Sequence, residues 1–311
     1  MRAGDQGHNV VTLSAMVRAM LHLSGLGLLL ACAAGSAVQP HTNMSSPDIR
    51  TFRPSVNGFA FVNHFTGSPI PFSLGGLENK IGAPSTFGLC GGMSFAAADL
   101  FLAGKAPPTR DKPPVKGEPE GGGAWFSYIQ SRQLTSLGGG GTGLELAAKF
   151  GRWMALPDNG GRADAPLLGT RTMTLGELGA IRATLAEGKP VVLGLVFNRH
   201  AGNTEAGGRI GVPWENHQVL AYDAASDGAS GRGNGAVMIR VYDPNYPKHD
   251  DAAIRCETVI TGTMLAGPWG GVRVPVLGVE CSRVVGAQRP TMVRGVFAMP
   301  YAPSPVPQTL R

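Results

Sequence analysis

Charged residues are scarce in this sequence: they make up 15% of its 311 residues, although the apolar fraction is an ordinary 43%. Glycine and proline are abundant, with 46 and 24 residues. A chain with this apolar content can bury a core, so the composition excludes a largely disordered protein and indicates a loop-rich globular one. The length is ample for one large domain, and the sequence contains no internal repeat.

The sequence also lacks a dense basic stripe. Its formal net charge is +6, but the arginines are scattered along the chain. Nucleic-acid binding usually shows clustered lysine and arginine with interleaved aromatic residues. The pattern therefore argues against a nucleic-acid partner, and a weak attraction to anionic polymers of a cell envelope is the more natural use of such a charge.

Motifs for metals and nucleotides are missing as well. No short histidine-rich spacing connects the side chains that a metal site would use. Those side chains are His217, Asp243, His249, Asp250 and Asp251. The glycine run 138–141 is not followed by the Lys-Ser/Thr pair of a phosphate-binding loop, so it is interpreted as a linker. We expect no metal and no cofactor.

The apolar run near the amino terminus is too short to cross a membrane. It spans residues 20–31, follows a basic residue and precedes small residues, which is typical of an export signal over residues 1–31. Within it, Leu29-Leu30-Ala31-Cys32 resembles the bacterial lipoprotein box, in which the cysteine carries lipid and begins the mature protein. Cleavage after Ala37 is the alternative. The expected location is the cell envelope, lipid-anchored through Cys32 or otherwise secreted or periplasmic.

The rest of the chain is expected to form a linker, a domain and a tail. Residues 32–57 are polar and contain proline and serine, which suits a lipid-anchored or free linker. The folded domain is expected over residues 58–303, with a tail over 304–311.

Helical patterns dominate the first half of this domain. After Cys90, apolar residues recur at the three-and-four spacing of a core helix that Gly104 ends. A second helix is expected around residues 125–129. Two capping boxes, Thr142 with Glu145 and Thr174 with Glu177, predict two further helices, the last ending at Gly188.

Strand patterns dominate the second half. A weak alternation over residues 58–63 predicts a first strand, and residues 190–197 read as a buried one. Residues 218–222 and 237–242 are expected to be neighbouring strands joined by the loop 223–235. Further strand-like runs cover residues 254–261, 272–279 and 291–298. Helices followed by a mostly antiparallel sheet predict an α+β fold.

Cysteine is rare: the sequence has four, and they lie in three different kinds of segment. Cys32 belongs to the signal, Cys90 lies in a glycine-flanked turn before a helix, and Cys256 and Cys281 lie in two late strand-like runs. In an oxidising compartment the last two can form a disulfide. The alternative is that both are small buried hydrophobic residues.

Cys90 has the surroundings of a nucleophile. A thiolate at a helix amino terminus is stabilised by the helix dipole and by free backbone N–H groups. The flanking glycines of Gly88-Leu89-Cys90-Gly91-Gly92 are interpreted as allowing a substrate carbonyl to approach the sulfur and the amides that would hold an oxyanion. The alternative is a structural cysteine in a glycine turn.

A nucleophilic cysteine needs a base, and the base needs an orienting group. His217 begins an apolar strand about 130 residues after Cys90, and Asp243 lies about 150 residues after Cys90. Both separations are near those seen in papain relatives. Taken alone, the histidine is more often a core residue and the Asp-Pro pair a turn. Asn245 is the alternative third residue.

Three segments carry a family resemblance: Phe87-Gly88-Leu89-Cys90-Gly91-Gly92-Met93-Ser94-Phe95, Asn216-His217-Gln218-Val219-Leu220 and Tyr242-Asp243-Pro244-Asn245. They are similar to the papain-like cysteine peptidase superfamily, in particular to a bacterial branch resembling the bacteriocin-processing double-glycine peptidases. The resemblance covers residues 58–300. It implies a papain-like fold, with an amino-terminal helical part that begins a helix at the cysteine and packs against a carboxyl-terminal sheet.

The resemblance also implies an activity: hydrolysis of a peptide or amide bond by a Cys90-His217-Asp243 triad. One position departs from the family, because Pro84 replaces the glutamine that papain places six residues before its cysteine to complete the oxyanion hole. Asn63 is the candidate replacement, with Ser85 and Thr86 as alternatives. Competing functions are a papain-fold binding module without turnover and an amidase or acyltransferase acting on cell-envelope material.

Overall fold

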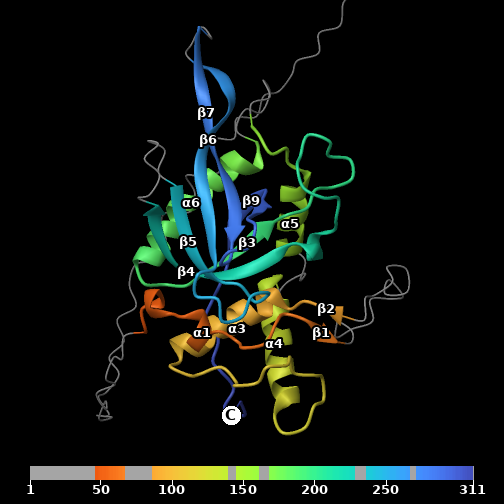
Figure 1. The fold of residues 1–311 in the computed structure, drawn as a ribbon. Helices are drawn as coiled ribbons and strands as arrows, with labels where there is room; N and C mark the ends of the chain where they lie inside the picture. The colour runs from red at the N-terminus through yellow and green to blue at the C-terminus, as the bar shows by residue number, and fades with distance from the viewer. Residues whose placement is uncertain are drawn as a thin grey trace, which may run out of the picture. The chain divides into compact units, whose positions relative to one another are not determined.

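An antiparallel sheet dominates the described part of the chain (Figure 1). The computed structural model describes residues 46–66, 86–138, 145–160, 168–227, 236–266 and 271–310. The expected export signal and Cys32 lie outside these residues. The sheet has seven described strands in the order β8-β7-β6-β5-β4-β3-β9. Their bounds are β3 Val191–Val196, β4 His217–Asp227, β5 Ala236–Tyr242, β6 Ala253–Ala266, β7 Val272–Val284, β8 Thr291–Val293 and β9 Gly295–Met299.

The two edges of this sheet meet. Strands β8 and β9 lie at opposite ends of the strand order, yet Arg294 alone separates them in the chain. The Arg294 N–H donates to the carbonyl of Val196 on β3, and its buried guanidinium pairs with Asp158 at 2.8 Å. The sheet therefore curls, and the expected single strand over 291–298 is divided where it passes from one edge to the other.

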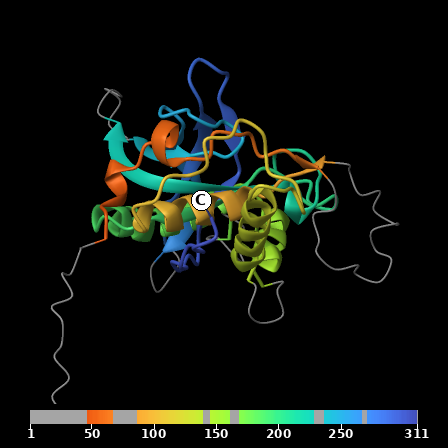
Figure 2. The ribbon, with the colours of Figure 1, turned by 90° about the horizontal axis from the view of Figure 1, so that it is seen from below.

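Helices pack on this sheet, and most precede it in the chain (Figure 2). The order confirms a mixed α+β class. The helices are η1 Ile49–Thr51, α1 Pro54–Asn57, α3 Cys90–Leu102, α4 Gly122–Ser136, α5 Glu145–Ala155, α6 Thr170–Ala186 and η2 Pro213–Glu215. A small ribbon pairs β1, Phe65–Thr66, with β2, Thr86–Phe87.

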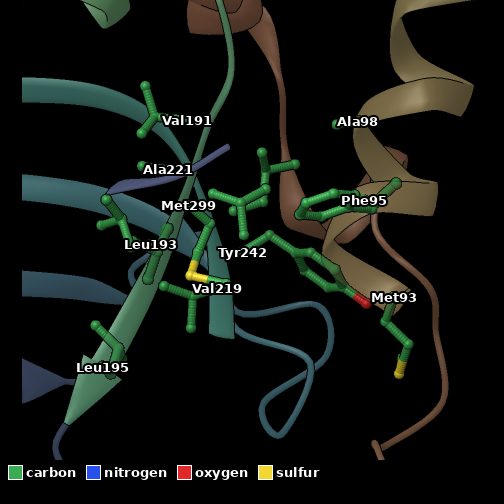
Figure 3. Close-up of a cluster of buried hydrophobic side chains, with 14 of the residues drawn as sticks. Met93, Phe95, Ala98, Val191, Leu193, Leu195, Val219, Ala221, Tyr242 and Met299 are labelled. Carbon is green, nitrogen blue, oxygen red and sulfur yellow. The ribbon is translucent and has the colours of Figure 1, made fainter. Parts of the chain in front are cut away.

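Helix α3 is the centre of the core. Its residues from Gly91 to Phe101 are all buried, because the sheet and α4 cover the helix from different sides. Met93 and Phe95 lie in one apolar cluster with Leu193, Val219 and Tyr242 of the sheet (Figure 3). The predicted helix is confirmed, and Gly104 adopts a positive φ of 62° just beyond its end.

Two predictions of local structure are wrong. Residues 58–63 form no strand. The side chains of Phe59 and Phe61 are buried because both rings fill the core, with their ring centroids 5.2 Å apart. Thr174 and Glu177 form no capping box, because α6 begins at Thr170. Their oxygens instead accept the N–H groups of Val296 and Ala298 on β9. Thr142, from the other predicted box, lies outside the described residues.

The folded body extends past the expected limits of 58–303. Ile49 and Phe52, in the expected linker, are fully buried. At the other end Leu310 is buried, and the N–H of Ser304 donates to Asp99. Both segments therefore contribute to the core.

Asp99 ties the carboxyl-terminal segment to the central helix. Its buried carboxylate pairs with Arg132 of α4 at 2.7 Å and accepts hydrogen bonds from the hydroxyls of Tyr128 and Tyr301. Arg132 in turn donates to the carbonyl of Ala302. Without the carboxylate, the hydroxyls of Tyr128 and Tyr301 would lose this acceptor, and Arg132 would keep only the carbonyl of Ala302 among the described residues.

We expect Asp99→Ala to lower the free energy of unfolding by about 3–5 kcal/mol, the usual cost of breaking a buried ion pair on one side. Asp111→Ala is the matched control: its carboxylate is 85% exposed, and it lies 3.6 Å from Lys248. This control should change stability by less than about 0.5 kcal/mol. Denaturant titration measures both, and equal effects would contradict the role given to the network.

Cys256 and Cys281 are direct partners in the antiparallel β6–β7 ladder. Both are free thiols in the structure, with sulfur atoms 2.6 Å apart. Directly opposed residues of such a ladder have Cα atoms about 4.5–5.5 Å apart, which a disulfide can span. The predicted bridge thus remains compatible with the fold.

We expect exported protein to carry the Cys256–Cys281 bridge. Closing a loop across their sequence separation of 25 stabilises the fold by roughly 3 kcal/mol, which reduction should remove. In a Cys90→Ala variant, alkylation of the denatured but unreduced protein should modify no cysteine of the mature domain. Modification of both residues would show that they are simply buried thiols.

Candidate functional site

Cys90 is the first residue of α3, and it is half-buried. The helix start is held by side chains from elsewhere in the chain. The Leu89 N–H donates to Oδ1 of Asn63 at 2.6 Å, and the Gly92 N–H donates to Oε1 of Gln133 at 2.8 Å. Between them, the N–H groups of Cys90 and Gly91 donate to no group in the described part of the chain. Two free amides therefore lie at the sulfur-bearing end of the helix.

The glycines beside Cys90 serve packing. Gly91 and Gly92 are both buried. A Cβ on Gly91 would lie 2.5 Å from Oε1 of Gln218, and one on Gly92 would overlap the carbonyl of Ile129 on α4. Their interpretation as openings for substrate is therefore wrong for these two positions, because they let α4 and β4 approach the helix start. Gly88 alone is exposed.

His217 begins β4 and is paired with Leu195 of β3. Its side chain is 6% exposed. Nε2 lies 2.6 Å from Oδ1 of Asp243, and Cys90 lies near enough for its charge to raise the pKa of the imidazole. Because Asp243 occupies Nε2, Nδ1 is the ring nitrogen left to interact with Cys90. The structure thus brings the three predicted residues together in the order Cys90, His217, Asp243.

Asp243 follows β5 and has no exposed surface. Its Oδ1 also accepts the N–H of Asn245 at 2.9 Å, and its Oδ2 lies 3.3 Å from Nη1 of Arg283. Arg283, on β7, was not predicted from the sequence. No motif marks it, because its role depends on a strand pairing late in the chain.

The charges of this cluster shift its titration. Burial lowers the pKa of His217, but the charges of Asp243 and Cys90 and the hydrogen bond to Asp243 raise it more, to about 10. Burial raises the pKa of Asp243, but the charge and hydrogen bond of His217, followed by Arg283 and the Asn245 N–H, hold it below its usual value. A protonated imidazole beside the ionised carboxylate of Asp243 is the favoured state at neutral pH.

Asn63 and Asn245 bind each other. Nδ2 of Asn63 donates to Oδ1 of Asn245 at 3.0 Å, and the Asn63 N–H donates to the carbonyl of Pro244. Asn63 therefore links the start of α3 to the Asp243 turn. In this arrangement it is Asp243, and not the alternative Asn245, whose side chain contacts His217. Pro84 and Ser85 lie outside the described residues.

The remaining candidate metal ligands are engaged away from this cluster. Asp250 accepts hydrogen bonds from Ser55, and Nδ1 of His249 lies 3.2 Å from Asp251. No group of three histidine, cysteine, aspartate or glutamate side chains in the described residues is arranged to hold a metal ion.

Comparison with protein-family models, curated proteins and solved structures found no match. None of the helices within the described ranges is long and apolar enough to span a membrane.

We expect the His217 imidazole to stay protonated through neutral pH and to titrate near pH 10. Because the folded pKa lies above the unfolded one of about 6.5, the stability that this group contributes is complete below pH 6.5 and is lost as the pH rises through about 10. Asp243→Asn removes the carboxylate that stabilises the imidazolium and should therefore lower the pKa of His217. NMR titration of the ring carbons measures both proteins, and a wild-type midpoint near 6.5 would contradict the ion pair.

Proposed function

We propose that this chain is an exported cysteine hydrolase of papain-like type that cleaves a peptide or amide bond. The observation that carries the proposal is a buried imidazole, that of His217, which is hydrogen-bonded to Asp243 and interacts electrostatically with Cys90. A cysteine at the start of a central helix, with histidine at the start of β4 and aspartate just after the neighbouring strand β5, supports the papain-like assignment. Export and the lipid on Cys32 rest on the sequence alone.

In the proposed mechanism His217 holds the proton of the Cys90 thiol, and the thiolate attacks the substrate carbonyl carbon. The carbonyl π electrons move to oxygen, and the free N–H of Cys90 stabilises that oxyanion, with the second amide hydrogen of Asn63 as a further donor. As the oxyanion collapses, the C–N bond breaks and His217 gives its proton to the leaving nitrogen. His217 then takes a proton from water, whose oxygen attacks the thioester and restores the Cys90 thiolate.

Asp243 orients the ring throughout. Its bond to Nε2 leaves Nδ1 to interact with Cys90, and its negative charge stabilises the imidazolium that each step forms. The triad defines the chemistry, while the substrate class follows from the family resemblance. Envelope amides and acyl acceptors would react by the same steps.

Alkylation of Cys90 by iodoacetamide tests the ion pair. Exposure alone would favour Cys90, because Cys256 and Cys281 are buried, so the decisive comparison is wild type against His217→Ala. Without the imidazolium the thiolate loses a stabilising positive charge, and labelling at pH 6 should slow roughly tenfold or more. Equal labelling rates in the two proteins would remove the basis for His217 as the activating group.

Turnover separates the hydrolase from a binding module. With p-nitrophenyl acetate as the acyl donor, wild type should release many equivalents of nitrophenol per chain, whereas Cys90→Ala should release none above the solvent rate and should remain folded by circular dichroism. Release that stops at one equivalent, or none at all, would leave the binding module as the better description.

A further inference from the structure

We propose that Arg283 is a positioning residue of the proposed hydrolase, holding the Asp243 carboxylate in the orientation that His217 requires. The inference rests on the proposed function for its catalytic meaning, but the contacts that carry it do not. Arg283 lies on β7, 40 residues after Asp243 in the chain. It does not touch Cys90 or His217 in the described contacts, so it acts through the carboxylate.

The carboxylate has two oxygens with different partners. Oδ1 faces the His217 imidazole and the Asn245 N–H, and Oδ2 faces Nη1 of Arg283 at 3.3 Å. With one oxygen held by Arg283, rotation about the Cβ–Cγ bond is restricted. The other oxygen then stays on the line to Nε2, and a fully buried carboxylate keeps a second cation beside it.

The guanidinium is itself fixed by two aromatic rings. Its Cζ lies 5.3 Å from the ring centroid of Phe197 and 4.9 Å from that of Tyr246, and its side chain is 13% exposed. Nη2 also donates to the Tyr246 hydroxyl at 3.4 Å. A planar guanidinium held between ring faces loses little further freedom when it binds the carboxylate.

The backbones of Phe197 and Tyr246 are hydrogen-bonded to segments of the candidate site. The N–H of Phe197 donates to the side chain of Asn216, the residue before His217. The N–H of Tyr246 donates to the carbonyl of Asp243 at 2.8 Å. The rings therefore place Arg283 relative to the histidine segment and to the aspartate turn together, which a surface ion pair does not do.

A double-mutant cycle tests whether Arg283 acts through Asp243. Arg283→Met should lower kcat for p-nitrophenyl acetate about tenfold in the wild-type background, but less than about twofold in an Asp243→Asn background, because groups that act as one unit are not additive. Arg283→Lys, which keeps the charge, should recover part of the loss. Arg273→Met, an exposed arginine on the same strand, is the matched control and should leave kcat unchanged. Thermal melting shows whether each variant folds, and Arg283→Gln replaces Arg283→Met if the latter does not.

An equal loss of kcat in both backgrounds would mean that Arg283 acts independently of Asp243 and would overturn the proposal, as would no loss in the wild-type background. A second readout does not depend on catalysis: the far-downfield NMR signal of the proton shared by His217 and Asp243 should weaken or shift in Arg283→Met and persist in Arg273→Met. If the protein hydrolyses no ester, the proposed function fails while this signal still decides the role of Arg283. An unchanged signal in Arg283→Met would reject it.

Discussion

The buried carboxylate of Asp243 is the constraint on which the rest of the site depends. Removing a carboxylate from water costs several kcal/mol unless donors and opposite charges replace the solvent. Here the replacements are the His217 imidazole, the Asn245 N–H and the Arg283 guanidinium. They come from β4, from the turn after β5 and from β7, so no single segment can supply them. The site exists only once the sheet has paired in its observed order.

This dependence explains why His217 favours its charged form despite its burial. Two cations face one carboxylate, and the group that can balance the remaining positive charge is Cys90 at the start of α3. In the proposed mechanism a thiolate there completes a series of alternating charges from Arg283 through Asp243 and His217 to the sulfur. The free amides at the helix start favour the same anion. The charge state of Asp243 and that of Cys90 are therefore coupled through the imidazole that lies between them.

The sequence was informative where chemistry and local pattern coincide. The helix after Cys90, the strand after Gly188 and the α+β order follow from periodicity and turn residues, and residue type with spacing singled out His217 and Asp243. Patterns failed where tertiary contacts replaced local ones. Phe59 and Phe61 alternate as in a strand but fill the core from an irregular segment, and Thr174 with Glu177 bind the backbone of β9. Arg283 carries no local signal, since an arginine in a strand is ordinary until the strand is placed.

The geometry at the sulfur has a similar tertiary origin. Asn63 bonds both to the residue before Cys90 and to the Asp243 turn, so one side chain connects the nucleophile segment to the acid segment. Gly88 lies against Asn63, because a Cβ on Gly88 would be 2.7 Å from the Asn63 amide nitrogen. A glycine at this position leaves room for the Asn63 side chain. On the other side, Gly92 lets α4 contact the helix start directly. A glycine-flanked cysteine is thus weak evidence for a nucleophile by itself. What distinguishes Cys90 is the contacts of its helix start. Asn63 and α4 both bind this helix start, and the imidazole of His217 on β4 lies near it.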